Sequence, residues 1–285
     1  MLQDRRVTLN GRAVVRATQA VAPDDKVEVA DRAVGRPAAD HRKSATRPGP
    51  KLDVVFEDDD LLVVEKPPGL LTSTTPGERR PTLLAMVRDH VEASAPARGR
   101  PPQVGLIHRL DRDASGLLVF SKTHEAYLSL KRQFFEHTVE RVYTAVVRGA
   151  PTPPAGRVES RLVERADGTV YSTRRPGEGE RAVTDYEVTR RLKGRSLVRV
   201  TLHTGRKHQI RVHLGERGAP IIGDTMYGKA AAKPKDRKQR PAGRLMLAAT
   251  RLSFAHPRTG ERLTFERPAP PAFAAALAGP GVPSR

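Results

Sequence analysis

Residues 105–122 read GLIHRLDRDASGLLVFSK, and the interpretation of the whole chain starts from this stretch. Two apolar runs, residues 106–107 and 117–120, are typical of short buried strands. The turn between them contains His108, Arg109, Asp111, Arg112 and Asp113. Buried or half-buried charges cost several kcal/mol unless they are paired. A carboxylate beside two arginines in so tight a turn therefore indicates a functional group, although a merely charged turn between two strands would read the same.

The net charge of the chain points to a polyanionic partner. Lys and Arg number 51 and Asp and Glu 32 among 285 residues, which gives a formal charge of +19. Binding to a nucleic acid would gain affinity from the release of counterions, whatever the base sequence. An arginine-rich composition also accompanies a GC-rich genome, but that does not explain why Asp and Glu fail to keep pace.

Other features of the composition exclude several classes of protein. The chain has no cysteine, which removes disulfides, thiolate zinc sites and cysteine nucleophiles. The first residues lack the apolar segment of a signal peptide, and no run is long enough to span a bilayer, so we expect a cytoplasmic protein. Tryptophan is absent and other aromatics are few, which argues against extensive base stacking on exposed rings.

The first 50 residues differ in texture from the rest. Residues 6–29 predict small strands, with a hairpin turn at Asn10-Gly11. They resemble the C-terminal half of an S4-type RNA-binding domain without its two opening helices. Residues 31–50 are rich in Arg, Pro, Ala and Asp and lack periodicity, which is typical of a flexible linker. We therefore expect a partial S4-like segment over 1–30, a linker over 31–50 and one folded domain over 51–285.

Within residues 51–285 the pattern predicts many strands and few helices. Strands are expected at 52–56, 61–64, 141–147, 182–189, 196–203, 245–254 and 262–265, and helices at 81–94, from Thr123 to about 136, and near 210–214. In the second helix Lys131 is expected to face away from the core. Residues 150–180 are turn-rich and predict no defined element. Because strict strand–helix alternation is absent, we expect an α+β domain with a mixed, mainly antiparallel central sheet and flanking helices and loops.

Two later segments are suited to phosphate groups. Residues 204–214 read TGRKHQIRVHL, in which Gly205 permits a sharp turn before a helix start. Arg206 and Lys207 beside the first N–H groups of that helix would suit a phosphate. Residues 229–244 are strongly basic with almost no apolar side chains and predict an RNA-facing insertion. Its candidate RNA-binding residues are Lys233, Lys235, Arg237, Lys238 and Arg240.

These segments together resemble the RluA-type family of RNA pseudouridine synthases. Residues 108–118, HRLDRDASGLL, are similar to the family signature, and 60–69, 141–143, 204–213, 220–224 and 227–228 match its other motifs in the family's order. The resemblance covers about residues 52–273 and implies the pseudouridine synthase fold. It departs from the pattern at Ala114, usually Thr, and at Arg141, often Lys.

The resemblance assigns roles to four residues, and the chemistry is consistent with them. Making pseudouridine breaks the bond from N1 to C1′, turns the base and joins C5 to C1′, which needs no metal or cofactor. By resemblance Asp111 is the carboxylate, which would attack the sugar or take its C2′ proton. Arg211 would pair with it and hold it ionised, since a nearby cation lowers a carboxylate pKa. Tyr143 would pack on the uracil and could help to move the C5 proton, or it is simply a core tyrosine. Arg109 would fill the space that the flipped base leaves.

Two other classes of function stay open at this point. The spacing of Asp111 and Asp113 mimics the Asp-x-Asp pair of magnesium-dependent phosphatases, but the second acidic pair that such enzymes need is not evident after residue 190. A non-catalytic RNA-binding protein would fit the charge and the S4-like segment. His208 and His213 have no nearby carboxylate in the sequence, so we expect no metal there.

The resemblance also suggests the substrate. Family members with an S4 domain commonly modify large-subunit ribosomal RNA, which we therefore expect, with transfer RNA as the alternative. We expect a monomer whose partner is RNA and which needs no cofactor and no membrane.

Overall fold

The computed structural model describes residues 7–9, 12–13, 26–29, 51–74, 80–94, 103–192, 194–227 and 243–278. The chain divides into two compact units, residues 1–50 and 51–285. In the first unit the strands β1 (Val7–Leu9), β2 (Arg12–Ala13) and β3 (Val27–Val29) form an antiparallel sheet in the order β2-β1-β3. These strands fall where the sequence predicts them. The expected linker over 31–50 lies outside the described residues.

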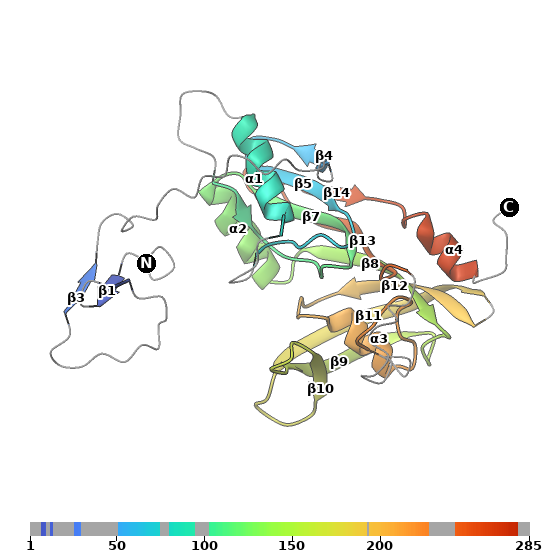
Figure 1. The fold of residues 1–285 in the computed structure, drawn as a ribbon. Coiled ribbons are helices and arrows are strands. Elements are labelled where there is room, and N and C mark those ends of the chain that lie inside the picture. Colours follow the sequence, from blue (N-terminus) through green and yellow to red (C-terminus); the bar gives the residue numbers. More distant parts are fainter. Residues whose placement is uncertain are drawn as a thin grey trace. The chain divides into compact units, whose positions relative to one another are not determined.

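The second unit is built on one sheet of 11 strands. Its strands are β4 (Asp53–Glu57), β5 (Leu61–Lys66), β6 (Gly105–Leu106), β7 (Ser115–Ser121), β8 (Glu140–Arg148), β9 (Ala155–Glu164), β10 (Val170–Thr173), β11 (Glu180–Leu192), β12 (Arg195–Leu202), β13 (Leu247–Ala255) and β14 (Arg262–Glu266). The main order is β10-β9-β11-β12-β8-β13-β7-β5-β4, with β14 beside β13 and β6 beside β7. Among these pairings only β13 with β7 is parallel. The expected mixed, mainly antiparallel α+β fold is confirmed (Figure 1).

Four helices in the described part of the chain pack on this sheet. They are α1 (Leu83–Ala93), α2 (His124–Phe135), α3 (Gln209–Glu216) and α4 (Ala272–Ala278). The hydroxyls of Thr82 and Thr123 accept hydrogen bonds from backbone N–H groups in the first turns of α1 and α2, which confirms the predicted cap at Thr123. Helix α2 contacts β7, α3 contacts β10 and β11, and α4 contacts β8 and β12 (Figure 1).

The sequence leaves residues 150–180 poorly determined, and the structure forms β9 and β10 there. Few side chains of β9 are buried, so its apolar pattern is weak. The pairing of β9 with β11 is accompanied by ion pairs across the two strands, from Arg157 to Asp185 and from Arg181 to Glu159. Cross-strand partners of this kind are chosen by the fold and have no signature in the local sequence.

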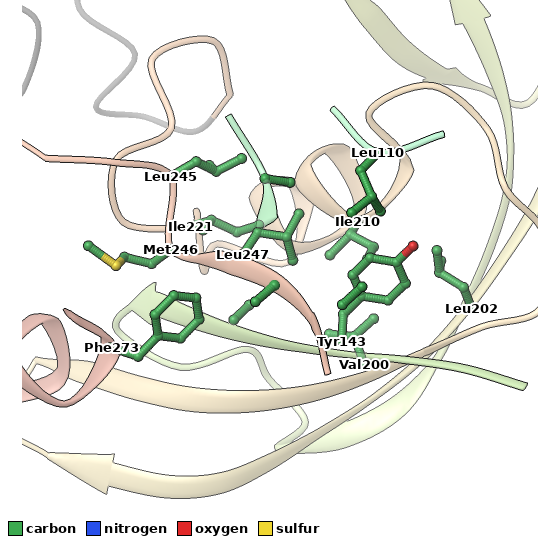
Figure 2. Close-up of a cluster of buried hydrophobic side chains, with 14 of the residues drawn as sticks. Leu110, Tyr143, Val200, Leu202, Ile210, Ile221, Leu245, Met246, Leu247 and Phe273 are labelled. Carbon is green, nitrogen blue, oxygen red and sulfur yellow. The ribbon is translucent and has the colours of Figure 1, made fainter. Parts of the chain in front are cut away.

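Both faces of the sheet centre are covered, which explains the continuous apolar runs of β5 and β7. Successive residues of β5 belong to different clusters: Leu62 and Val64 lie in the larger core, Leu61 and Val63 in the smaller one. Figure 2 shows the larger core near β8, where Phe273 of α4 lies at one end and Tyr143 at the other. The core therefore ends on the side chain to which the family resemblance assigns a functional role.

No helix among the described residues has the length and apolar character required to cross a membrane.

Candidate active site

Asp111 lies in the loop between β6 and β7, and a buried lysine holds that loop in place. The side chain of Lys66 is fully buried, and its Nζ donates to the carbonyl oxygens of Pro67, Leu70 and Arg112 at 3.0, 2.8 and 2.8 Å. Burial lowers the pKa of Lys66 to about 8, against the opposing effect of Asp113 and Asp111. Since a buried ammonium needs its acceptors, these three bonds fix the backbone next to Asp111.

Arg211 of α3 joins Asp111 to a second carboxylate. Its Nη1 donates to Oδ2 of Asp111 at 3.2 Å, while Nε and Nη2 donate to the two oxygens of Asp224 at 2.8 and 2.9 Å. The predicted partnership of Arg211 with Asp111 is present, but the two-point contact is with Asp224. Burial alone would lower the pKa of Arg211, yet the two carboxylates raise it overall. The guanidinium is therefore a permanent cation at this place.

The segment after α3 that contains Asp224 and Tyr227 holds Arg211 in position. Oδ1 of Asp224 also accepts the backbone N–H groups of Met226 and Tyr227 at 2.8 and 3.2 Å. The guanidinium carbon of Arg211 lies 5.1 Å from the ring centre of Tyr227, in the range of a cation–π contact. The Tyr227 hydroxyl accepts from the N–H of Val170 and contacts Nδ1 of His208 at 2.6 Å. The guanidinium is thus held by Asp224 and Tyr227 in addition to its hydrogen bond to Asp111.

Tyr143 of β8 lies at the boundary between the core and the site. Figure 2 shows its ring among Leu110, Ile210 and Leu202, with the hydroxyl at the outer end. Burial raises the pKa of Tyr143 to about 12, with a smaller contribution from Asp111 and an opposing one from Arg141. The phenol therefore stays protonated in the neutral range. It is both a core residue and a wall of the site.

A cavity of about 840 Å³ brings the predicted residues together. Its lining includes Arg109, Asp111, Tyr143, Arg206, Lys207 and Arg211. These side chains come from separate stretches of sequence. A cavity of this size is large enough for a small molecule or a single nucleotide. The Asp111 side chain is 23% exposed, so its carboxylate is accessible from the cavity while its partner Arg211 is buried.

The two basic residues before α3 have partners at the cavity rim. Arg206 forms an ion pair with Glu180 at 3.0 Å, and Lys207 with Glu164. Their loop is shaped by Gln209, whose Oε1 accepts from the N–H of Arg206 and from the hydroxyl of Thr204. The helix begins after His208, whose φ of 55° is left-handed. Neither cation is free, so any phosphate contact there would compete with a carboxylate.

Arg109 and the basic insertion differ from Arg206 and Lys207 in what the structure shows of their contacts. The Arg109 side chain is exposed at the cavity and has no ion pair or hydrogen bond within the described ranges. Residues 228–242 lie outside those ranges, and they include Lys233, Lys235, Arg237, Lys238 and Arg240. Lys131, predicted to face away from the core, is exposed as expected. It also lines the cavity and donates to the carbonyl of Ile107 at 3.3 Å.

The histidines of the motifs are structural. Nε2 of His108 accepts the N–H of Val119, and its ring stacks on Phe134 at 4.7 Å. Burial, aided by Arg141 and Lys131, lowers the pKa of His108 to about 3. His213 contacts the hydroxyls of Ser160 and Thr184, and burial lowers its pKa to about 4. Both rings are therefore neutral at pH 7.

Only one group of histidines and carboxylates in the described residues has the spacing of metal ligands, and none of its members lines the cavity of Asp111. It consists of Asp58, Asp60 and His256. Both oxygens of Asp60 accept from Arg258 at 2.6 Å, and Asp58 accepts from two backbone N–H groups and from His256. These contacts join two turns of the sheet. Asp224, the carboxylate that shares Arg211 with Asp111, has both oxygens occupied by that arginine.

Sequence reasoning assigns no role to Asp224, Tyr227 or Lys66, although the quoted motifs contain all three. Their functions depend on neighbours far along the chain. A usable signal exists for Lys66, because a lysine so soon after four apolar strand residues has to be buried or to end the strand. No comparable local signal exists for Asp224.

Comparison with known proteins identifies the family. The family model described as RNA pseudouridylate synthase matches residues 60–216. The ribosomal large subunit pseudouridine synthase D of Neisseria meningitidis serogroup B is 38% identical over 223 residues, which are 77% of this chain and 58% of that protein. An uncharacterized RNA pseudouridine synthase of Bacillus subtilis is 36% identical over 272 residues, 94% of this chain and 84% of that protein.

A solved structure agrees with the family match. The human RNA pseudouridylate synthase domain containing 1 protein superposes with a TM-score of 0.61 and 27% identity, covering 81% of this chain and 90% of that one. The chain belongs to the RNA pseudouridylate synthase family. Its match spans 58% of the length of the Neisseria protein.

Proposed function

We propose that this protein converts uridines in RNA to pseudouridines, with Asp111 as the reacting carboxylate. The observation that carries the proposal is the placement of Asp111 in a cavity of about 840 Å³, with its Oδ2 3.2 Å from Nη1 of Arg211. The family match covers the same residues. One carboxylate suffices for the reaction, which changes no oxidation state.

The step at Asp111 begins with the carboxylate ionised beside Arg211. The carboxylate either attacks C1′ of the target nucleotide or removes its C2′ proton, and the bond from C1′ to N1 breaks. The uracil turns and C5 bonds to C1′. On the first route the bond between Asp111 and C1′ breaks as C5 attacks, and on the second route Asp111 returns the proton to C2′. The proton on C5 then leaves to solvent or to a nearby base, and N1 takes up a proton in exchange. Arg211 stabilises the negative charge of Asp111 whenever its carboxylate is free of the sugar or of the C2′ proton. Asp224 keeps the guanidinium of Arg211 in place during these steps.

Tyr143 and Arg109 would hold the nucleotide in place. The Tyr143 ring forms part of the cavity wall that Asp111 also lines and would pack against the uracil. Because burial raises its pKa to about 12, the phenol is protonated when the nucleotide enters. Arg109, exposed and without a partner in the described part of the chain, would enter the space left by the flipped base.

Phosphate contacts would supply most of the affinity. Arg206 and Lys207 at the rim, and the basic residues of the insertion named above, are the proposed RNA-binding groups. Residues 1–30 are proposed to act as a partial S4-like RNA-binding segment, tethered by a linker over 31–50 to the catalytic domain over 51–285. The Bacillus subtilis match extends over 94% of the chain, so it includes part of this N-terminal segment.

The proposed substrate is large-subunit ribosomal RNA. The name of the Neisseria protein supports this choice, as does the formal charge of +19. We propose that the protein acts as a monomer in the cytoplasm. Mapping pseudouridines in ribosomal and transfer RNA from cells that lack the protein tests the substrate. Loss of a site from transfer RNA alone would overturn the ribosomal assignment while leaving the reaction intact.

The reaction itself is tested with Asp111→Asn. The amide keeps the shape of the side chain but is neither nucleophile nor base, so isomerisation should be lost while RNA affinity stays nearly unchanged. The assay is tritium release from RNA labelled at C5 of uridine, with binding measured in parallel. Substantial tritium release by this variant would exclude Asp111 as the reacting group. Asp113→Asn is the matched control, because Asp113 lies in the same loop but does not line the cavity.

A further inference from the structure

Arg141 is a buried cation whose charge no carboxylate balances in the described part of the chain. It is 7% exposed, lies on β8 and lines the cavity. Its Nη2 donates to the carbonyl oxygens of Leu202 and His203 at 3.4 and 3.2 Å, at or beyond the upper end of the usual range. Its Nε has no hydrogen-bond partner, and Nη1 makes no hydrogen bond to any described residue.

The contrast with Arg211 shows how unusual this is. The two arginines are equally buried in the same cavity, but Arg211 contacts two carboxylates and uses three of its nitrogens. A buried charge that lacks a counter-ion costs several kcal/mol. Burial lowers the pKa of Arg141, and the only group that offsets this effect is Tyr143. The described contacts of Arg141 are thus two carbonyl oxygens and the ring of Phe134, 5.3 Å from its guanidinium carbon, and none of them is an anion.

Gly205 keeps space open beside this guanidinium. A Cβ atom at position 205 would lie 2.7 Å from Nη1 of Arg141, closer than such atoms approach. The sequence suggested that Gly205 is there to permit a sharp turn. Its backbone is not in the left-handed region, so the turn itself does not require glycine. The absent side chain instead leaves Nη1 its position at the cavity wall.

The surroundings of Arg141 are positive. Arg141 helps to lower the pKa of His137 and of His108, in each case after burial as the largest cause. Lys131 and Arg206 line the same cavity. The carboxylates of Glu164 and Glu180, which also line it, are bound to Lys207 and Arg206. The region thus attracts an anion, and those two carboxylates are already engaged elsewhere.

We propose that Arg141 binds a phosphodiester group of the RNA strand immediately next to the target nucleotide. The proposal rests on the proposed function above and names a contact of that same site. A phosphate carries the full negative charge that balances the guanidinium, which a uracil carbonyl does not, and its oxygens match the guanidinium fork. Arg141 and Tyr143 point to the same face of β8, roughly 7 Å apart along the strand. That spacing lets one residue hold a backbone phosphate while the other meets the base.

The test is a double-mutant cycle between the arginine and the phosphates. Short RNA substrates are made with a neutral methylphosphonate at the linkage on the 5′ side or the 3′ side of the target uridine. Their binding is measured to the wild-type protein and to Arg141→Met. At one of the two positions the neutral linkage should weaken binding to wild type by about tenfold or more, as expected for a hydrogen-bonded charge pair. The same change should have little effect on Arg141→Met.

Control variants separate this contact from general electrostatics and from misfolding. Arg148→Met removes an exposed arginine from the same strand outside the cavity and should respond to the methylphosphonates as wild type does. If Arg141→Met does not fold, Arg141→Gln takes its place in the cycle.

Two results would overturn the proposal: equal wild-type affinity for all three RNAs, or equal weakening in wild type and variant. Isomerisation of the unmodified RNA by wild type is measured separately, so failure of the reaction is distinguished from failure of the phosphate contact.

Discussion

Replacing Asp224 with asparagine tests whether a second carboxylate is needed to position Arg211. Asparagine can still accept through one oxygen, but its NH₂ group would face the Nε–H of Arg211, donor against donor. Breaking a buried ion pair on one side typically costs about 3–5 kcal/mol. For a domain of this size each kcal/mol lowers the melting temperature by roughly 2–4 °C. We therefore expect the melting temperature to fall by roughly 6–20 °C.

Turnover should fall as well, because the guanidinium would then be held mainly by Asp111. Displacing a catalytic group by about 1 Å can cost about 100-fold in rate, so a loss of roughly 10–100-fold is expected. Thermal unfolding and single-turnover tritium release, measured below the melting temperature of the variant, report the two effects separately. RNA affinity should change little, since the Asp224 side chain is buried.

Asp185→Asn is the matched control. Asp185 makes a similar two-point contact with Arg157 at 2.6 and 2.8 Å, but on the surface, where such pairs contribute about 1 kcal/mol or less. If Asp224→Asn leaves both melting temperature and turnover unchanged, Asp224 does not hold Arg211. A loss of stability with normal turnover would restrict Asp224 to a role in folding.

Three further outcomes are expected. The pKa of His213 is about 6.5 in the unfolded chain and about 4 in the folded one, so the unfolded chain binds more protons as the pH drops. The free energy of unfolding should therefore fall by about 3 kcal/mol between pH 7 and 4 because of this residue. An equally acid-sensitive His213→Gln protein, measured by urea unfolding, would contradict this. Neutralising the basic insertion means replacing Lys233, Lys235, Arg237, Lys238 and Arg240 together. The slope of log affinity against log salt concentration should then become less steep by roughly 0.7–0.9 for each phosphate group that the variant no longer binds. An identical slope would mean that the insertion does not contact the RNA. A chain beginning at Lys51 should melt near the melting temperature of the full chain and react with a short RNA at a similar maximal rate. It should bind large structured RNA less tightly than the full chain does. Equal affinity of the two chains would show that residues 1–50 add nothing to RNA binding.

Features that depend on near neighbours can be predicted from the sequence alone. The apolar runs of β5 and β7, the caps at Thr82 and Thr123 and the hairpin from β11 to β12 follow from local periodicity and hydrogen-bonding groups. The turn around Asp111 stands out in the sequence because it places charges between two buried strands, and the reacting role of Asp111 stays a prediction. Strands β9 and β10 are not evident from the sequence, because the pairing of β9 with β11 is accompanied by ion pairs and not by apolar alternation.

The assembly of the site depends on contacts between residues that are remote in the sequence. Arg211 lies 13 residues from Asp224 and 100 from Asp111, and nothing local ranks its two-point contact with Asp224 above its single contact with Asp111. The lack of a carboxylate partner for Arg141 in the described residues, and the approach of Gly205 to its Nη1, likewise depend on which strands lie side by side. Charge pairing and close packing are properties of distances in space, and distances between remote residues are set only when the sheet forms around the cavity.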